Sequence, residues 1–481
     1  MGMINKGKTL ANLIWVFMER FGAQGVTFIV SIILARILDP KMFGQLALIT
    51  VFITIMQLLV DSGLISALVQ KKDSDDVDFS SAFIFNLVVG IGMYFLMFVS
   101  APFLNDCFGM EGMVWPIRVF SLVLIMSAFK NIQQAYITKN MKFKLFFFST
   151  IGGTLVAAVI GIIMALRGYG IWALIYQTVI NQAIDTVILW IASGYHPVMR
   201  FDSVKFMRLY KYGWKLLLSS LIYNIYNEAV KLFIGMKFTD KDLGFYNNGV
   251  KVPEFICTNF NSALDGVLFP AAAMNQDDKA HMKNIARRAI KIGTFIIMPL
   301  MIGLAVCAHS FVVVFLTEKW VPSVPYVVIF CLSFALYPIH VTNLNIIKAM
   351  GRSDLFLNLE MIKEGISVIA LIVALHISPV AVAVSILVMS IVSIPINMWP
   401  NRTLIDYKIF EQLKDILPDI ILSVIMGGIV YVIGLVPTGF TLRLIFQITG
   451  GMCFYIIVAE VLDLESYEYL KSAIREMRHR G

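Results

Sequence analysis

The sequence predicts an all-α integral membrane protein with about fourteen transmembrane helices. Three observations indicate this fold class. Apolar residues make up 59% of the 481 positions and charged residues only 15%, whereas an average soluble domain carries roughly 25% charge. The apolar residues form continuous runs, long enough for a helix to cross a hydrocarbon core about 30 Å thick. Lysine and arginine gather in alternate loops between these runs.

Each expected helix is an apolar run of roughly 20 residues or more, bounded by polar or charged residues. The runs lack the alternation of membrane β-strands, so we expect helices. The first run follows Lys6 and Lys8 without a small-residue cleavage site, which favours a retained helix over a removed signal peptide. In order, the expected helices occupy 12–36, 43–69, 80–104, 114–138, 147–166, 170–194, 210–236, 243–273, 286–316, 323–348, 354–377, 380–400, 416–436 and 441–463.

The order of these helices predicts two lobes. A charged link, residues 195–209, follows the sixth helix, and an even number of helices gives both lobes the same orientation, as in parallel repeats. We therefore expect an N-lobe over 1–209 and a C-lobe over 210–400. The segment 401–481 adds two helices and a charged amphipathic tail, which is typical of a solvated or interfacial helix.

The basic residues predict the orientation. With the amino terminus inside, 27 of the 39 lysines and arginines fall in loops on the inner side. Only Lys41, Arg167, Lys237, Lys241 and Lys319 fall in loops on the outer side. This asymmetry places both termini in the cytoplasm of a multi-pass protein. The net charge of +8 is thus mainly a topology signal, and no soluble basic face for nucleic acid is expected.

Sequence motifs for enzymatic chemistry are missing. There is no phosphate-binding loop of the Gly-x-x-x-x-Gly-Lys-Ser/Thr type and no His-Glu-x-x-His zinc helix. The five cysteines lack the spacing of a metal site, and the six histidines are isolated. We therefore expect no enzyme, no metal and no cofactor. Transport would draw on an ion gradient, a partner or the gradient of the substrate itself.

Polar residues inside the apolar runs form stripes. A charge at the middle of a membrane costs about 2.5–3.5 kcal/mol on insertion scales, so it normally faces a cavity or a partner. At roughly 100° per residue, four stripes each share one helix face. They are Arg20, Gln24, Thr27 and Ser31 in the first helix; Thr50, Thr54, Gln57 and Asp61 in the second; Asn224, Glu228 and Lys231 in the seventh; and Asn247, Lys251, Glu254, Thr258, Asn261 and Asp265 in the eighth.

These stripes allow two interpretations. Polar side chains often bridge membrane helices, so each stripe could simply hold neighbouring helices together. The stripes contain charges of both signs, however, and they fall on corresponding helices of the two halves. This favours a polar central cavity between the lobes, lined by helices one, two, seven and eight. Lys130 lies deep in the fourth helix, and Asp185 in the sixth could be an ion partner or a simple counter-charge.

Several segments also resemble a known family. Leu34 to Gly44 (LARILDPKMFG) resembles the first outward turn of bacterial polysaccharide exporters, with Lys41-Met42 in place of the family's acidic pair. Asp61-Ser62-Gly63-Leu64, Lys142-Phe143-Lys144 and Gly168 to Leu174 (GYGIWAL) are similar to that family too. The sequence resembles Wzx-type lipid-linked oligosaccharide flippases of the polysaccharide transport family. Their superfamily also contains multidrug exporters and the lipid II flippase.

The resemblance implies a substrate and a mechanism. The substrate would be an undecaprenyl-diphosphate-linked oligosaccharide, moved to the outer leaflet of a bacterial inner membrane by alternating access. Cavity residues would neutralise the diphosphate and hydrogen-bond the sugar. The candidates for substrate binding are Arg20, Gln24, Gln57, Lys130, Asn224, Lys231, Asn247, Lys251 and Asn261. The candidates for coupling to H⁺ or Na⁺, which could instead merely pair with lysines, are Asp61, Glu228, Glu254 and Asp265.

Two other functional classes stay open. A multidrug cation antiporter of the same superfamily would have an acidic, aromatic cavity and usually about twelve helices. A membrane polysaccharide polymerase or ligase would usually carry a large outer loop with catalytic residues, and every outer loop here is short. The expected partners are the lipid-linked substrate, membrane lipid and the polymerase or export machinery of the same pathway. A monomer is expected, and no nucleic acid.

Overall fold

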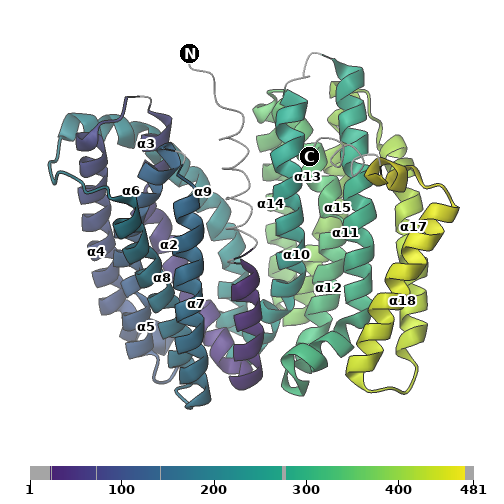
Figure 1. Ribbon diagram of the computed structural model, residues 1–481, viewed down its shortest axis with the longest axis horizontal. Helices are drawn as coiled ribbons and strands as arrows, with labels where there is room; N and C mark the ends of the chain where they lie inside the picture. Colours follow the sequence, from purple (N-terminus) through teal and green to yellow (C-terminus); the bar gives the residue numbers. More distant parts are fainter. Residues whose placement is uncertain (1–21, 23, 72, 141, 274–277, 472–481) are drawn as a thin grey trace. The chain divides into compact units, whose positions relative to one another are not determined.

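A computed structural model describes residues 22, 24–71, 73–140, 142–273 and 278–471, and it is helical throughout, with no strand among these residues. Figure 1 shows the helices. They divide into two compact units, Met1–Gly244 and Phe245–Gly481. The described helices of the first unit are Gln24–Ile37, α2 (Pro40–Asp61), α3 (Leu64–Gln70), α4 (Asp76–Cys107), α5 (Val114–Phe120), α6 (Leu122–Lys139), α7 (Lys144–Leu166), α8 (Ile171–Ser193) and α9 (Ser203–Lys237).

The second unit begins five residues into α10 (Asp240–Ala273). The expected lobes meet at residue 209 instead, and this division stays a prediction. The unit boundary lies later because α9 packs on α2, α3 and α4. The other helices of the second unit are α11 (Lys279–Leu316), η1 (Glu318–Ser323), α12 (Val324–Ala335), α13 (Tyr337–Ala349), α14 (Ser353–Leu375), α15 (Pro379–Met398), α16 (Asn401–Leu404), α17 (Ile409–Gly434) and α18 (Phe440–Val461).

Ten helical segments of the described chain are long and apolar enough to cross a membrane. They match ten of the expected helices and confirm an all-α membrane protein. Helices α9, α10 and α14 lie where three more were expected, but their polar and charged residues keep them out of this group. Gln24–Ile37 is apolar and short, because it is only the described part of the first expected helix. The total of fourteen stays a prediction.

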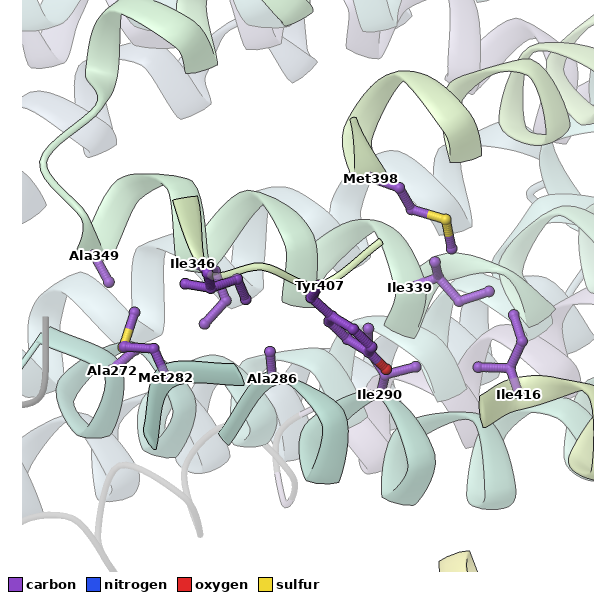
Figure 2. Packing of buried hydrophobic residues seen from close by; sticks show 11 residues of the cluster. Ala272, Met282, Ala286, Ile290, Ile339, Ile346, Ala349, Met398, Tyr407 and Ile416 are labelled. Carbon is purple, nitrogen blue, oxygen red and sulfur yellow. The ribbon is translucent and has the colours of Figure 1, made fainter. Parts of the chain in front are cut away.

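Apolar clusters pack the helices together near the ends that the charge pattern predicts to face the cytoplasm. In the first unit, Phe79 and Phe83 of α4 pack against Leu64, Leu68 and Ile132. In the second unit, Tyr407 lies between the helices, with Ile290, Ile339 and Ile416 in the same cluster (Figure 2). Tyr407 has no exposed surface, and its hydroxyl donates to Asp415 at 2.7 Å. Helices α17 and α18 pack on α11 through a further cluster.

A constant offset of 200 residues relates the two helix pairs expected to line the cavity. Gln24–Ile37 ends and α2 begins at Pro40, while α9 ends at Lys237 and α10 begins at Asp240. The connecting turns also match in sequence, because Lys41 and Gly44 correspond to Lys241 and Gly244. Asp61-Ser62 likewise corresponds to Asn261-Ser262. This repeat supports the expected relation between helices one and two and helices seven and eight.

Candidate functional site

A buried serine joins three helices of the first unit. The Ser127 hydroxyl on α6 accepts a hydrogen bond from the Gln57 amide on α2 at 3.1 Å, and another from the Gln182 amide on α8 at 3.4 Å. Ser127 is 6% exposed. Buried amides need partners, so these bonds fix the three helices at one level. Gln57 was expected in the cavity, and in the structure its amide contacts Ser127.

An ion pair lies one helical turn further along the same helices. Lys130 Nζ on α6 is 2.6 Å from Asp185 Oδ2 on α8, and the two side chains are 19% and 5% exposed. Ser127 precedes Lys130 by three residues, and Gln182 precedes Asp185 by three, so each pair shares a helix face. The other carboxylate oxygen of Asp185 is buried and has no hydrogen-bond partner among the residues that the structure describes. We call Gln57, Ser127, Lys130, Gln182 and Asp185 the α6–α8 polar cluster.

Small residues of α7 allow α8 to approach closely. A Cβ atom on Gly153 would lie 2.8 Å from the side-chain oxygen of Asn181, and one on Gly161 would lie 3.0 Å from the Cβ of Gln177. Glycine-lined contacts of this kind are common between membrane helices. They hold the face of α8 that carries Gln182 and Asp185 at a fixed distance from its neighbours.

Asp61 ends α2 at a break in the helix. Its carboxylate accepts a hydrogen bond from the backbone N–H of Ile65 in α3. Its Oδ1 atom is buried and has no hydrogen-bond partner among the described residues. Ser62 and Gly63 between the helices adopt left-handed φ angles of 51° and 68°. Asp61 therefore helps to begin α3, a structural role beside the coupling role expected from the sequence.

The charges on α9 pair with each other. Lys231 donates to the two carboxylate oxygens of Glu228 at 3.0 and 3.1 Å, within one helical turn. Asn224 precedes Glu228 by one turn and is half-buried. The stripe predicted on the seventh helix thus exists, and its cation and its anion neutralise each other in this structure.

The stripe on α10 belongs to the second unit. Asn247 and Lys251 are half-buried, and Glu254 is exposed. Asn261 is buried, and its amide donates to the Cys257 sulfur at 3.2 Å. Its side-chain oxygen has no hydrogen-bond partner within the described part of the chain. Of the remaining candidates, Gln24 is exposed. Arg20 and the side chain of Asp265 lie outside the described part of the molecule.

The structure brings Gln57 and Lys130 into one cluster and adds three members that were not among the sequence candidates. These are Ser127, Gln182 and Asp185, of which only Asp185 was considered as a partner. The same spacing of three residues in the fourth and sixth apolar runs, Ser127 to Lys130 and Gln182 to Asp185, is the signal that could have identified them. Within the described ranges, no group of three or more His, Cys, Asp or Glu residues could hold a metal ion.

Comparisons with known proteins find similar sequences among proteins of polysaccharide biosynthesis. A family model described as "Polysaccharide biosynthesis protein" matches residues 33–325. The succinoglycan biosynthesis transport protein ExoT of Rhizobium meliloti is 24% identical over 352 residues, which cover 73% of this chain and 71% of ExoT. The teichuronic acid biosynthesis protein TuaB of Bacillus subtilis is 22% identical over 431 residues, 87% of each chain.

Two solved structures share the fold. The lipid II flippase MurJ in an inward closed conformation superposes with a TM-score of 0.73 at 14% identity, over 94% of this chain and 98% of MurJ. An inward-facing multidrug resistance transporter of the MATE family gives a TM-score of 0.64 at 12% identity, over 80% of this chain and 94% of that one. At these identities the likeness concerns the fold alone.

Proposed function

The chain belongs to the polysaccharide biosynthesis protein family, and from this premise we propose that it moves an undecaprenyl-diphosphate-linked oligosaccharide across the bacterial plasma membrane. It is a multi-pass membrane protein, and its relatives and structural neighbours include named transporters and a flippase. The match to the family model, which covers residues 33–325, is the observation that carries the proposal.

Cations and amides within apolar helices suit this substrate. A diphosphate needs positive charge, for which Arg20, Lys231 and Lys251 are the proposed ligands. Arginine can bind phosphate oxygens with two parallel hydrogen bonds, whereas lysine offers a point charge. The sugar needs both donors and acceptors, and the amides of Gln24, Gln57, Asn224, Asn247 and Asn261 would supply them.

Paired charges suggest how transport could couple to an ion. Glu228 and Lys231 neutralise each other, and so do Lys130 and Asp185. A proton or Na⁺ that binds the carboxylate releases the lysine for the anionic substrate. Of the proposed coupling residues, Glu228 pairs with Lys231. Asp185 joins them here as the partner of Lys130, and Asp61, Glu254 and Asp265 are further coupling candidates. We propose alternating access driven by this exchange.

A flipping assay in liposomes tests the proposal. Purified protein should move a fluorescent lipid-linked oligosaccharide between leaflets, measured by the fraction that an impermeant quencher no longer reaches. Arg20→Ala should abolish this movement in a protein that still inserts, while Arg20→Lys should keep part of it because the charge remains. Full activity of Arg20→Ala at normal protein levels would exclude the proposed role of Arg20.

The same preparation separates the two alternatives. Proton- or Na⁺-driven accumulation of a cationic dye, without movement of the lipid-linked oligosaccharide, would indicate a multidrug antiporter. Lengthening of the glycan chain in the presence of lipid-linked repeat units would indicate a polymerase. Either result, with no flipping, would contradict the proposed function.

A further inference from the structure

Two helix-initiating turns of the first unit cross with their backbones in contact. They are the first turn of α2, Pro40 to Gly44, and the first turn of α10, Asp240 to Gly244. A Cβ atom on Gly44 would lie 1.7 Å from the carbonyl oxygen of Asp240. A Cβ atom on Gly244 would lie 2.2 Å from the carbonyl oxygen of Pro40. No side chain fits at either position, so only glycine permits this crossing.

The contact is reciprocal. Gly44 lies against the carbonyl of Asp240, four residues before Gly244, and Gly244 lies against the carbonyl of Pro40, four residues before Gly44. The two turns are 200 residues apart in the sequence. Equivalent residues of the two repeats therefore meet each other here, as they do on a pseudo-two-fold axis. Both turns carry basic residues, Lys41 and Lys241, of loops that the charge pattern places on the outer side of the membrane.

Each turn is fixed by hydrogen bonds of its own. The Asp39 carboxylate accepts from the backbone N–H of Lys41 at 2.9 Å, which begins α2. The Thr239 hydroxyl and the Asp242 carboxylate accept from each other's backbone N–H at 3.2 and 3.1 Å, which begins α10. Between the turns, the side chain of Gln45 hydrogen-bonds the Asp240 carboxylate. Because the hydrogen bonds that begin each helix lie within its own turn, the two turns would keep them if they separated.

We propose that the Gly44–Gly244 crossing is the outer closure of the transport route, made when the route is closed to the outside and broken when it opens. The inference rests on the proposed function, because closure and opening presuppose alternating access. In this proposal the two glycines form the closure and do not bind the substrate. The first turn of α10 would leave α2 at each transport cycle.

Labelling of a cysteine inside the route tests the closure. The reporter is Thr54→Cys on α2, in a chain whose exposed Cys107 and Cys453 are replaced by serine; the other three cysteines are buried. Gly44→Ala and Gly244→Ala should each raise the rate at which an impermeant maleimide labels the reporter in intact cells. A roughly tenfold rise corresponds to about 1.4 kcal/mol against the closed state. Gly92→Ala is the matched control, because nothing lies within 4 Å of a Cβ at that helical glycine.

A second variant covers the case in which the glycine variants fail to fold. Gln45→Ala removes the hydrogen bond to Asp240 and adds no bulk, so labelling should rise by roughly fivefold, equivalent to about 1 kcal/mol. Folded variants that label like the parent chain would overturn the proposal. Labelling reports on the closure whatever the substrate is. A failed flipping assay with wild-type protein would contradict the proposed function and leave the outcome of the labelling test valid.

Discussion

Lys130 and Asp185 show how a single residue can suggest one role in a sequence and another in a structure. In sequence, a lysine deep in an apolar run looks like a ligand for an anion. In the structure, it has a carboxylate partner at 2.6 Å. An unpaired charge is far more costly inside a membrane protein than a pair. A substrate that binds Lys130 must therefore compete with Asp185 for it.

Removal of one partner should destabilise the protein more than removal of both. Lys130→Met leaves the Asp185 carboxylate buried without its cation, which typically costs about 3–5 kcal/mol. We expect a clear loss of thermal stability in detergent for Lys130→Met. The double variant Lys130→Met/Asp185→Leu should recover most of that loss. If the double variant is stable and still flips its substrate at the wild-type rate, the pair has no part in transport.

Asp75 gives a prediction about pH outside the membrane-spanning helices. The ammonium group of Lys205 beside it, together with the backbone N–H of Asp78, lowers the pKa of the Asp75 carboxyl to about 2. A carboxyl whose pKa is lowered on folding stabilises the protein above its unfolded pKa of roughly 4. That stabilisation is lost as the pH falls from about 4 to about 2.

The variant Asp75→Asn isolates this effect. Asparagine can still accept the hydrogen bond that begins α4, but it has no charge to lose. Melting temperatures between pH 6 and pH 3 should therefore fall less steeply for the variant than for the parent chain. Parallel curves for the two proteins would show that the ion pair with Lys205 does not contribute to stability.

At the scale of helices, α17 and α18 are attached to α11 by a charged cluster. The Asp415 carboxylate of α17 accepts from the Arg287 guanidinium at 2.8–3.0 Å and lies 3.2 Å from Lys291 Nζ. Lys291 also pairs with Glu465 beyond α18. Burial opposes ionisation of Glu465, but hydrogen bonds from Lys291 and Tyr469 prevail and lower its pKa. A cavity of about 360 Å³ lies beside these residues.

Loss of Asp415 should loosen the two terminal helices. Asp415→Leu leaves Lys291, 5% exposed, and Arg287 with only the half-exposed Glu465, so we expect a cost of about 3 kcal/mol or more. Limited proteolysis should then cleave the segment between α16 and α17 faster. Glu465→Gln is the control, because Lys291 keeps Asp415, and it should change the cleavage rate much less. Equal rates for both variants would exclude Asp415 as the main attachment.

Helix positions could be predicted from the sequence more fully than helix continuity. Hydropathy located the ten apolar segments, because burial in lipid requires long apolar runs. It did not show that the run at 114–138 is two helices, α5 and α6, which meet at Ser121, or that 323–348 is broken at Leu336. Pro338 follows that second break and lacks the N–H that would continue the helix.

The candidate site could be predicted only in part for a related reason. Periodicity shows which residues share a face of one helix, but it does not show which helices are neighbours. Gln57 and Lys130 were therefore identified singly, whereas their link through Ser127 depends on the packing of α2, α6 and α8. Lys231 and Glu228 are three residues apart on one helix, so their pairing could have been predicted from the sequence.

At the scale of the whole molecule, the charge asymmetry predicts which loops face the medium. Cys107 is exposed at the end of α4, at a loop expected outside. In a chain whose other exposed cysteine, Cys453, is replaced by serine, an impermeant maleimide should therefore label Cys107 in intact cells, and Cys107→Ser should remove the signal. A cysteine placed at exposed Lys279 in the Cys107→Ser background should react only after the cells are opened. Labelling of Lys279→Cys in intact cells would reverse the assigned orientation.

The 200-residue offset also has a historical consequence. The two helix pairs keep one spacing, from Gln24 and Asn224 to Asp61 and Asn261, as the two copies of a duplicated segment would. The copies have since diverged in charge: Phe28 and Ser31 stand where the later copy has Glu228 and Lys231, and Val51 and Thr54 where it has Lys251 and Glu254. The symmetry survives in the backbone at Gly44 and Gly244, while Glu228, Lys231, Lys251 and Glu254 have no ionic counterpart in the first copy. A chain assembled from two identical halves would keep the two glycine turns, but both halves would then have the same charged residues.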